Sequence, residues 1–252
     1  MRELWQYREL TWNLTVVDLK NRYQNTALGF FWSILSPLLM ALVLYFVFRY
    51  LFMQEPNFAA YLLVGLMSWR FFATGTTAGL YSVVGKPSLV TKVYVPRKIL
   101  VLSNTLSNLI SSLIEFVIII PILYVVSGQL PGTLWLFPSV FLAYFWFVYG
   151  IALFLASLYV YLRDLNQIWE VVCQILFFLS PIFYPMSAIQ GTLPLYLLNP
   201  NTEFIIIFRD LMLYGKLPTL YSLSIVVIAS IMAYLIGSIV FRRLQRRFAE
   251  EI

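Results

Sequence analysis

Long apolar runs recur along this chain and constrain its fold more than any other feature. Six of them lie at roughly 29–51, 58–85, 99–126, 135–161, 168–184 and 220–241. A transmembrane helix needs about 20 apolar residues to cross roughly 30 Å of hydrocarbon. Only 11% of the residues are charged, whereas a soluble domain has about 25%. We therefore expect an all-α integral membrane protein with six transmembrane helices, forming one domain over 1–252 with its bundle at 29–241.

The basic residues fall mostly on one side of these six runs. When alternate connections are grouped, 13 of the 17 Lys and Arg residues lie on the side that holds both ends of the chain. These are Arg2, Arg8, Lys20, Arg22, Lys86, Lys92, Arg97, Lys98, Arg163, Arg242, Arg243, Arg246 and Arg247. Cytoplasmic segments of membrane proteins are enriched in Lys and Arg. We therefore expect both termini in the cytoplasm.

Residues 1–28 mix apolar and charged side chains ahead of the first run. Helices of this kind lie in the plane of the membrane interface, where Trp is favoured. We expect a cytoplasmic, N-terminal amphipathic interface helix; a solvated tail is the alternative. Its candidate residues are Trp5, Arg8, Trp12, Asp18, Lys20 and Arg22. At the other end of the chain, 242–252 would form a cytoplasmic tail whose arginines lie near anionic headgroups.

The segment between the fifth and sixth runs is broken by Pro and Gly but stays rich in Leu and Ile. Its stretches 193–198 and 204–213 are too short to cross a bilayer. Broken backbone is stable at membrane depth only beside protein or a water-filled cavity. We therefore expect two short re-entrant helices on the extracytoplasmic side, between spans five and six. A folded external cap is the alternative.

Two ionisable residues, Arg70 and Glu115, lie inside the second and third runs. At 1.5 Å per residue, both are about 24 Å from the cytoplasmic boundary. An unpaired charge inside the membrane costs several kcal/mol, so we expect the two charged groups to lie close together. They would form either the wall of a hydrophilic path or an ion pair that only locks two helices.

Aromatic residues crowd the middle of the fourth run, at Tyr144, Phe145, Trp146, Phe147 and Tyr149. Aromatic belts that face lipid lie at the two membrane–water interfaces and not in the middle of a span. These rings would therefore pack inside the bundle, or line a path whose rings and hydroxyls suit sugars. The sequence leaves both interpretations open.

The chain has no histidine and a single cysteine, Cys173, and no cluster of carboxylates replaces them. Histidine is the commonest metal ligand and general base, so we expect no metal site and no catalytic residue. The stretch 79–87 has glycines and Lys86, but Pro87 stands where a phosphate-binding loop has Ser or Thr. We expect no cofactor in this chain, so any ATP and magnesium would bind another polypeptide.

Several stretches, in order along the chain, resemble the membrane subunits of type-two ABC exporters of O-antigen, capsule and teichoic-acid polymers. They read DLKNRY at 18–23 leading into LGFFWSILSP at 28–37, YLLVGL at 61–66, VYVPR at 93–97, YLRDL at 161–165, SPIFYP at 180–185, and NP at 199–200 followed by FRD at 208–210 and YG at 214–215. Each stretch alone is weak evidence. Together they cover most of the chain and are specific.

The resemblance implies the permease subunit of an ATP-driven exporter that moves an undecaprenyl-linked polysaccharide, with O-antigen favoured, across the bacterial inner membrane. It implies a homodimer of permeases with two copies of a separate cytoplasmic ABC ATPase, in contact with membrane lipid and not with nucleic acid. The residues alone leave two alternatives open: a membrane-embedded glycan- or lipid-modifying enzyme, and a proton-coupled secondary transporter.

The resemblance also assigns roles to segments. Residues 1–28 and 86–98 would face the ATPase, and the second would be a coupling helix, because it is basic and Pro87 and Pro96 bracket a helix-sized segment. A topology determinant is its alternative role. The coupling candidates are Lys86, Lys92, Val93, Tyr94, Pro96, Arg97 and Lys98.

A polymer path and its exit complete the expected site. We expect the path to run beside the first and fifth spans and the intramembrane charges. Its candidates are Tyr45, Phe46, Arg70, Glu115, Phe177, Phe178 and Tyr184. We expect an exit gate in the broken segment after the fifth span, with the candidates Pro185, Leu193, Asn199, Pro200 and Arg209.

Overall fold

The computed structural model describes residues 6–24, 29–50, 57–91, 95–128, 131–185 and 199–251. All regular secondary structure within these ranges is helical. The elements are α2 (Arg8–Tyr23), α3 (Phe31–Phe48), α4 (Phe58–Tyr81), α5 (Pro87–Thr91), α6 (Lys98–Ser127), η1 (Gly132–Leu136), α7 (Phe137–Tyr159), α8 (Leu165–Leu179), α9 (Pro200–Arg209), η4 (Asp210–Tyr214), α10 (Leu220–Leu244), η5 (Gln245–Arg247) and α11 (Phe248–Glu251).

Five helices in these ranges are long and apolar enough to cross a membrane, and they correspond to the first four expected spans and the last. The remaining expected span, 168–184, is α8, which has only 15 residues and ends before Ser180. Pro181 explains this end, because proline lacks an N–H and disfavours the helical conformation in the residue before it. The chain is a multi-pass membrane protein with five candidate spans in the part that the structure describes, and a sixth crossing by α8 stays a prediction.

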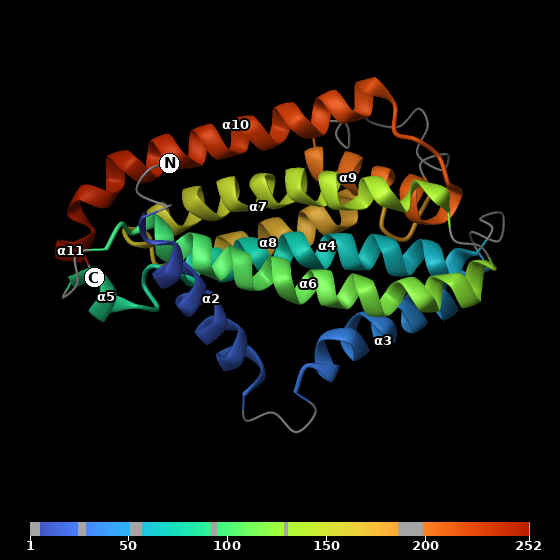
Figure 1. Ribbon diagram of the computed structural model, residues 1–252, viewed down its shortest axis with the longest axis horizontal. Helices are drawn as coiled ribbons and strands as arrows, with labels where there is room; N and C mark the ends of the chain where they lie inside the picture. The colour runs from blue at the N-terminus through green and yellow to red at the C-terminus, as the bar shows by residue number, and fades with distance from the viewer. Residues whose placement is uncertain are drawn as a thin grey trace.

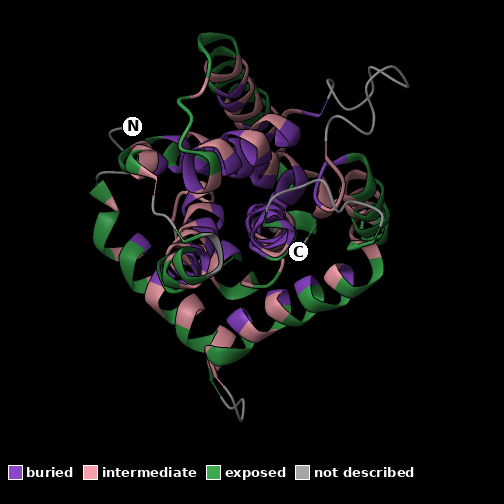
Figure 2. Ribbon diagram, turned by 90° about the vertical axis from the view of Figure 1, so that its right-hand side faces the viewer, coloured by how far each residue is buried: buried purple, intermediate pink, exposed green. Residues whose placement is uncertain are grey.

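The helix α4 is buried along most of its length and contacts α3, α6, α7, α8 and α9. Figure 2 shows the buried residues gathered in the middle of the bundle and the exposed ones on the surrounding helices. Small residues allow neighbouring backbones to approach closely. A Cβ added to Gly79 would overlap the side chain of Ala152 in α7, and one added to Gly237 of α10 would overlap the carbonyl oxygen of Gly150.

Four of the five aromatic residues in the middle of the fourth span are buried inside the bundle, whereas Trp146 is 38% exposed. The ring of Tyr144 is fully buried and lies 4.3 Å from that of Phe204, and its hydroxyl donates to the carbonyl of Ser68 at 3.0 Å. Tyr149 is also buried, with its ring 6.0 Å from that of Tyr234. The structure thus supports the packing interpretation over the sugar-lined path for these rings.

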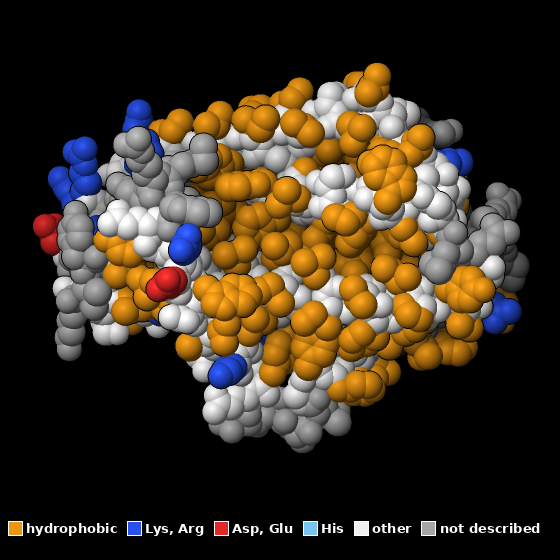
Figure 3. All heavy atoms as spheres, in the orientation of Figure 1, with side chains coloured by type: hydrophobic (Ala, Val, Ile, Leu, Met, Phe, Trp, Pro, Cys, Tyr) orange, Lys and Arg blue, Asp and Glu red, His pale blue; other side chains and the backbone are white. Residues whose placement is uncertain are grey.

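The two ends of the bundle carry different elements. In Figure 1, α2 begins and α10 ends at the left, where α5 and α11 also lie, whereas α9 lies in the opposite half. Figure 3 shows hydrophobic side chains covering most of one face between the ends. Because α2 begins and α10 ends at the same end of the bundle, the chain would cross an even number of times, with α8 as one of the crossings. We call the left-hand end the α5 end and the opposite one the α9 end.

Candidate functional site

The expected coupling segment begins with an ion pair to α2. Lys86 Nζ lies 2.7 Å from Asp18 Oδ2, and the hydroxyl of Ser103 in α6 donates to the same oxygen at 3.4 Å. The Lys86 and Asp18 side chains are only 20% and 11% exposed. The amphipathic helix is therefore tied to the start of the coupling segment.

The coupling segment ends in contacts with the chain beyond α10. Arg97 Nη1 donates to the carbonyl of Gln245, and the Arg97 guanidinium lies 5.8 Å from the centre of the Phe248 ring. Lys98 Nζ donates to the hydroxyl of Ser238 at 2.5 Å. These basic side chains, predicted from sequence to face a partner, thus contact their own chain.

The first half of the segment contains the expected short helix, α5, although with only five residues. It lies between Pro87 and Pro96, the two prolines that predicted it. Ser88 is exposed. Lys92, Val93 and Tyr94 lie outside the described residues.

The sequence correctly predicted a helix within 1–28. Figure 1 shows that α2 is inclined to the bundle, and it packs against α6. Trp12 is 57% exposed and Arg8 and Lys20 are exposed, whereas Asp18 and Arg22 contact the bundle. Trp5 lies outside the described residues. That α2 lies in the plane of the membrane interface stays a prediction.

The predicted proximity of Arg70 and Glu115 is confirmed. Arg70 Nη2 lies 3.8 Å from Glu115 Oε1, and the two side chains are 26% and 4% exposed. This distance fits an ion pair but is too long for a hydrogen bond. The pair links α4 to α6 inside the bundle, and its place on a transport path stays a prediction.

A buried polar seam on α6 escaped the sequence analysis. It comprises Ser103, Ser107, Asn108, Ser111, Ser112 and Glu115. The spacing of three, four and one residues places these side chains on one side of the helix. This helical spacing of polar residues is the pattern that predicts a polar side on the third span, although most of that span is apolar.

Asn108 connects three helices through this seam. Its amide nitrogen donates to the carbonyl of Phe71 at 3.0 Å, and its oxygen accepts from Thr74 Oγ1 at 2.7 Å. The same oxygen accepts from Arg22 Nη1 of α2 at 3.3 Å. The hydroxyls of Ser107 and Ser111 have no hydrogen-bond partner among the described residues. The seam therefore carries hydrogen-bonding capacity in the interior beyond what the helix contacts use.

The path candidates divide between inward and outward positions. Phe177 packs against Trp69 with ring centres 5.7 Å apart, and Tyr45 packs against Phe58 at 6.2 Å. Tyr184 donates from its hydroxyl to the carbonyl of Phe178 at 2.8 Å. The first and fifth runs do meet, since the rings of Phe48 and Phe183 lie 4.9 Å apart.

The remaining path candidates, Phe46 and Phe178, are 64% and 65% exposed and lie on outer faces of α3 and α8. The exposed side of α8 also carries Glu170 and Gln174, which the sequence analysis did not include in the path. A carboxylate that faces lipid is costly, so such groups face protein or water. Glu170 therefore needs protein or water beside it, although the same side of α8 also carries the exposed Ile168, Val171 and Ile175.

Arg209, an exit-gate candidate, lies buried where α8 ends. It donates to the carbonyls of Pro181 at 2.5 Å, Ile182 at 2.8 Å and Tyr61 at 3.3 Å, and its guanidinium carbon lies 3.4 Å from the centre of the Tyr61 ring. Only 3% of the residue is exposed. Its guanidinium satisfies the carbonyls of Pro181 and Ile182, which the break leaves outside a helix, and also contacts the carbonyl of Tyr61 within α4. In this structure Arg209 is a bracket between α9, α4 and the end of α8.

Asn199 and Pro200 begin α9. The Asn199 side chain accepts from the backbone N–H of Asn201 at 3.1 Å and donates to the hydroxyl of Ser180 at 3.0 Å. Pro200 occupies a first-turn position, where a missing N–H costs nothing. The expected helix 204–213 therefore starts four residues earlier, and it continues into the π-helical turn η4. Pro185 is half-buried just after Tyr184, whereas Leu193 and the stretch 193–198 lie outside the described residues.

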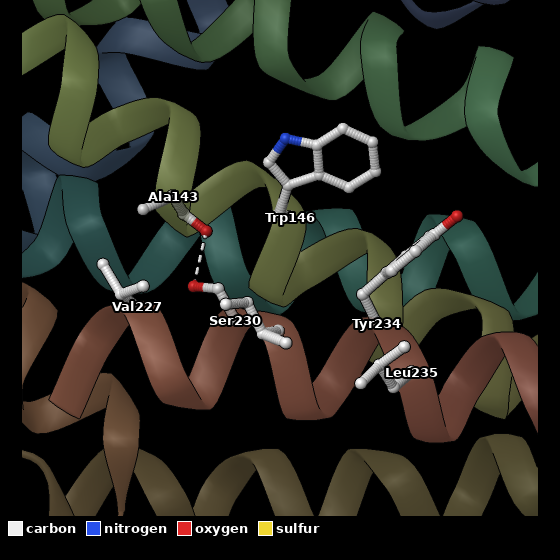
Figure 4. Close-up of a pocket in the computed structure, with 7 residues that line it drawn as sticks. Ala143, Trp146, Val227, Ser230, Tyr234 and Leu235 are labelled. Carbon is white, nitrogen blue, oxygen red and sulfur yellow. Dashed lines mark hydrogen bonds between the residues drawn. The ribbon is translucent and has the colours of Figure 1, made fainter. Parts of the chain in front are cut away.

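An apolar groove of about 340 Å³ lies between α7 and α10, away from every site candidate. It is lined by Ala143, Trp146, Val227, Ser230, Ile231, Tyr234 and Leu235 (Figure 4). The Ser230 hydroxyl donates to the carbonyl of Ala143 at 2.8 Å. The buried hydroxyl in the groove lining, that of Ser230, is therefore already hydrogen-bonded between α7 and α10.

The five helices long enough to span a membrane, the internal ion pair, the tethered short helix α5 at one end and the short helix α9 after the break at Pro181 fit the membrane subunit of a transporter. Residues 9–213 match the ABC-2 type transporter family, and the chain belongs to this family. It is therefore a permease subunit and not a catalytic one, and the resemblance seen in its motifs is confirmed. Family membership favours this interpretation over the membrane-embedded enzyme and the secondary transporter.

Curated relatives align with nearly the whole chain. Two proteins of Klebsiella pneumoniae, each named O-antigen export system permease protein RfbA, are 30% and 31% identical to it over 94% of this chain and 92% of their own length. A protein of the same name from Myxococcus xanthus is 32% identical over 100% of this chain and 98% of its own length.

Proposed function

We propose that this chain is the permease of an ATP-driven exporter that moves undecaprenyl-linked O-antigen across the bacterial inner membrane. The observation that carries the proposal is the similarity to O-antigen export permeases of two organisms over almost the entire length. Family membership supplies the mechanism class: the permease moves the substrate, and ATP and magnesium bind a separate ABC ATPase.

Deletion of the chain in its native host tests the substrate. We expect surface O-antigen to disappear and the lipid-linked polymer to accumulate inside, and a plasmid copy to restore export. Capsule and teichoic-acid polymers, quantified in the same cells, serve as controls. If one of those polymers were lost from the surface and O-antigen were intact, the proposed substrate would be wrong. If no polymer were lost, the proposed export function would be wrong.

We further propose that two permeases assemble with two ATPases, and that α5 docks on the ATPase. Exposure of Ser88 between the two tethered ends of the segment supports this. A photoreactive or disulfide cross-link from Ser88→Cys should capture the ATPase in native membranes. Lys216→Cys, an exposed position beyond η4, is the matched control. Equal capture from both positions would contradict docking at α5.

The proposed topology has six crossings, with α8 as the fifth and the α5 end in the cytoplasm. The common end of α2, α5 and α11 and the distribution of Lys and Arg support it. In a Cys173→Ala background, an impermeant thiol reagent added to intact spheroplasts should label Lys216→Cys and not Glu251→Cys. The reverse pattern would invert the topology.

The path is proposed to run between the two permeases, along the outward faces of α3 and α8. The exposed Phe46, Phe178, Glu170 and Gln174 support this, because a second copy or water would cover their faces. A Gln174→Cys variant should form an ATP-sensitive cross-link between copies or react with a soluble reagent during export. Ile228→Cys, 55% exposed on α10 and outside the groove, is the lipid-facing control.

The broken segment around α9 is proposed to form the exit gate. Single cysteines along 193–213 should react with an impermeant reagent from outside, and more strongly during ATP-driven export than at rest. Reactivity that is blind to ATP would mean a passive cap, and the gate would have to be abandoned.

A further inference from the structure

The chain folds back on itself after α10. Residues 245–251, which we call the hook, comprise η5 and α11 and lie at the α5 end of the bundle, where α11 contacts α5. The sequence suggested a tail held near lipid headgroups by its arginines. The structure shows that Phe248 of this tail is packed into the protein, whereas its arginines are exposed and their place near headgroups stays a prediction.

One aromatic side chain anchors the hook. Phe248 is fully buried, with its ring 5.4 Å from that of Phe241 in α10 and 6.2 Å from that of Tyr161, which follows α7. The Arg97 guanidinium lies over the same ring at 5.8 Å. Phe248 thus joins the end of α10, the connection after α7 and the end of the coupling segment.

Polar contacts fix the backbone around this anchor. The Tyr161 hydroxyl donates to the carbonyl of Leu244 at 2.8 Å, and Arg97 donates to the carbonyl of Gln245. Arg163 Nη2 donates to the carbonyl of Glu251 at 3.3 Å. The last carbonyls of a helix have no partner within the helix, so these donors make the hook part of the bundle.

The coupling segment is consequently held at two ends by different helices. Lys86 ties its start to Asp18 of α2, and Arg97 ties its finish to the hook of α10. A short helix held at only one end would rotate freely when pushed. Held at both ends, it transmits a displacement to α2 and to α10.

We propose that the hook is a positioning element for energy coupling, in which Phe248 holds Arg97 and so makes α5 and α10 move together when the ATPase pushes on α5. This inference rests on the proposed docking of the ATPase at α5. It assigns Phe248 no contact with the polysaccharide or with ATP.

The test uses the complete permease–ATPase complex in vesicles and measures glycan exported per ATP hydrolysed. Phe248→Ala should lower this ratio by about tenfold or more, because truncating a buried Phe removes most of the energy that holds its site, while ATP hydrolysis continues. Phe248→Leu keeps an apolar side chain there and should recover most of the ratio. Glu250→Ala, at an exposed position on the same short helix, is the matched control.

Hydrogen exchange of the same complexes separates coupling from misfolding. Phe248→Ala should raise exchange within 86–98 and leave the amides of α4 protected. If Phe248→Ala exported as much glycan per ATP as Glu250→Ala, the proposed coupling role of the hook would be wrong. A loss of protection throughout the bundle in Phe248→Ala would contradict it as well. Failure of the Ser88 cross-link with the ATPase would instead overturn the docking proposal, so the two failures are distinguishable.

Discussion

The two ends of this bundle use basic side chains in opposite ways. At the α5 end, Lys86, Arg97 and Arg163 each make one or two contacts that tie separate segments together. At the α9 end, the single side chain of Arg209 is buried and binds three backbone carbonyls and an aromatic ring.

This difference separates adjustable connections from a fixed one. Each connection at the α5 end is a single hydrogen bond or ion pair, and a hydrogen bond contributes about 1 kcal/mol, or about 1.5–3 kcal/mol where a charged group takes part. Exchanging one such connection therefore costs less than breaking the several bonds of Arg209 at once. Removing the donor from several buried carbonyls costs about 1–3 kcal/mol for each group. We infer that the α5 end is built to move and that the bracket at Arg209 holds α9 in place, so the proposed gating movement at the α9 end occurs outside this bracket.

The largest expected effect comes from breaking the fixed bracket. Arg209→Met leaves the carbonyls of Tyr61, Pro181 and Ile182 without this donor, which we expect to destabilise the fold by roughly 3 kcal/mol or more. Folded protein recovered by size-exclusion chromatography, with its thermal midpoint, measures the loss. Lys216→Met, exposed beyond η4, is the control, and equal stability of the two variants would refute the bracket.

The next effect concerns the ion pair inside the bundle. Arg70→Met leaves the Glu115 carboxylate, which is 4% exposed, without its partner. Such a change costs about 3 kcal/mol. Glu115→Gln should cost less, because Arg70 is 26% exposed and keeps access to water. Thermal midpoints of both single variants and the double variant give the coupling energy, and additive losses would show that the pair contributes nothing.

A charge exchange sharpens the comparison at the α5 end. Asp18→Lys or Lys86→Asp alone should lose roughly 2 kcal/mol or more of stability, because each change places two like charges together at a mostly buried site, and should lose most of the export. The double exchange should recover export, because it restores opposite charges at the same two positions. Lys20→Asp, exposed on the same helix, controls for charge. Export that stays low in the double exchange would mean that the two side chains act separately.

The smallest expected effect tests one bond of the α5 end. Tyr161→Phe keeps the ring beside Phe248 and removes only the hydroxyl that donates to Leu244. We expect a loss of about 1 kcal/mol and a small rise in hydrogen exchange at η5. A collapse as large as that of Arg209→Met would remove the distinction between the two ends.

The sequence predicted the features that follow from composition and from rare residues. Long apolar runs give the five long helices, and Pro87 and Pro96 gave the short helix between them. Arg70 and Glu115 could be paired from sequence because intramembrane charges need a partner or water. Pro181 indicates that the fifth helix is shorter than its apolar run, and α8 does end before Ser180. Its crossing of the membrane stays a prediction.

Other features could not be predicted, because they depend on which residues the fold brings into contact. Arg209 binds backbone carbonyls, and every residue has one, so no pattern identifies which carbonyls lie within reach. The polar seam of α6 has a helical spacing but is spread through an otherwise apolar run. Phe248 follows four arginines whose charge dominates any interpretation of that stretch, and only the fold shows the ring beneath Tyr161.

ATP-driven transport by the purified assembly is the most direct test of the account. The tagged chain, isolated from native membrane with whatever ATPase accompanies it, would be placed in vesicles that carry undecaprenyl-linked O-antigen. We predict that the ATPase co-purifies, and that ATP with magnesium moves the glycan to the opposite leaflet, where an impermeant glycosidase reaches it. Absence of an accompanying ATPase, or glycan that stays protected despite ATP hydrolysis, would contradict the account.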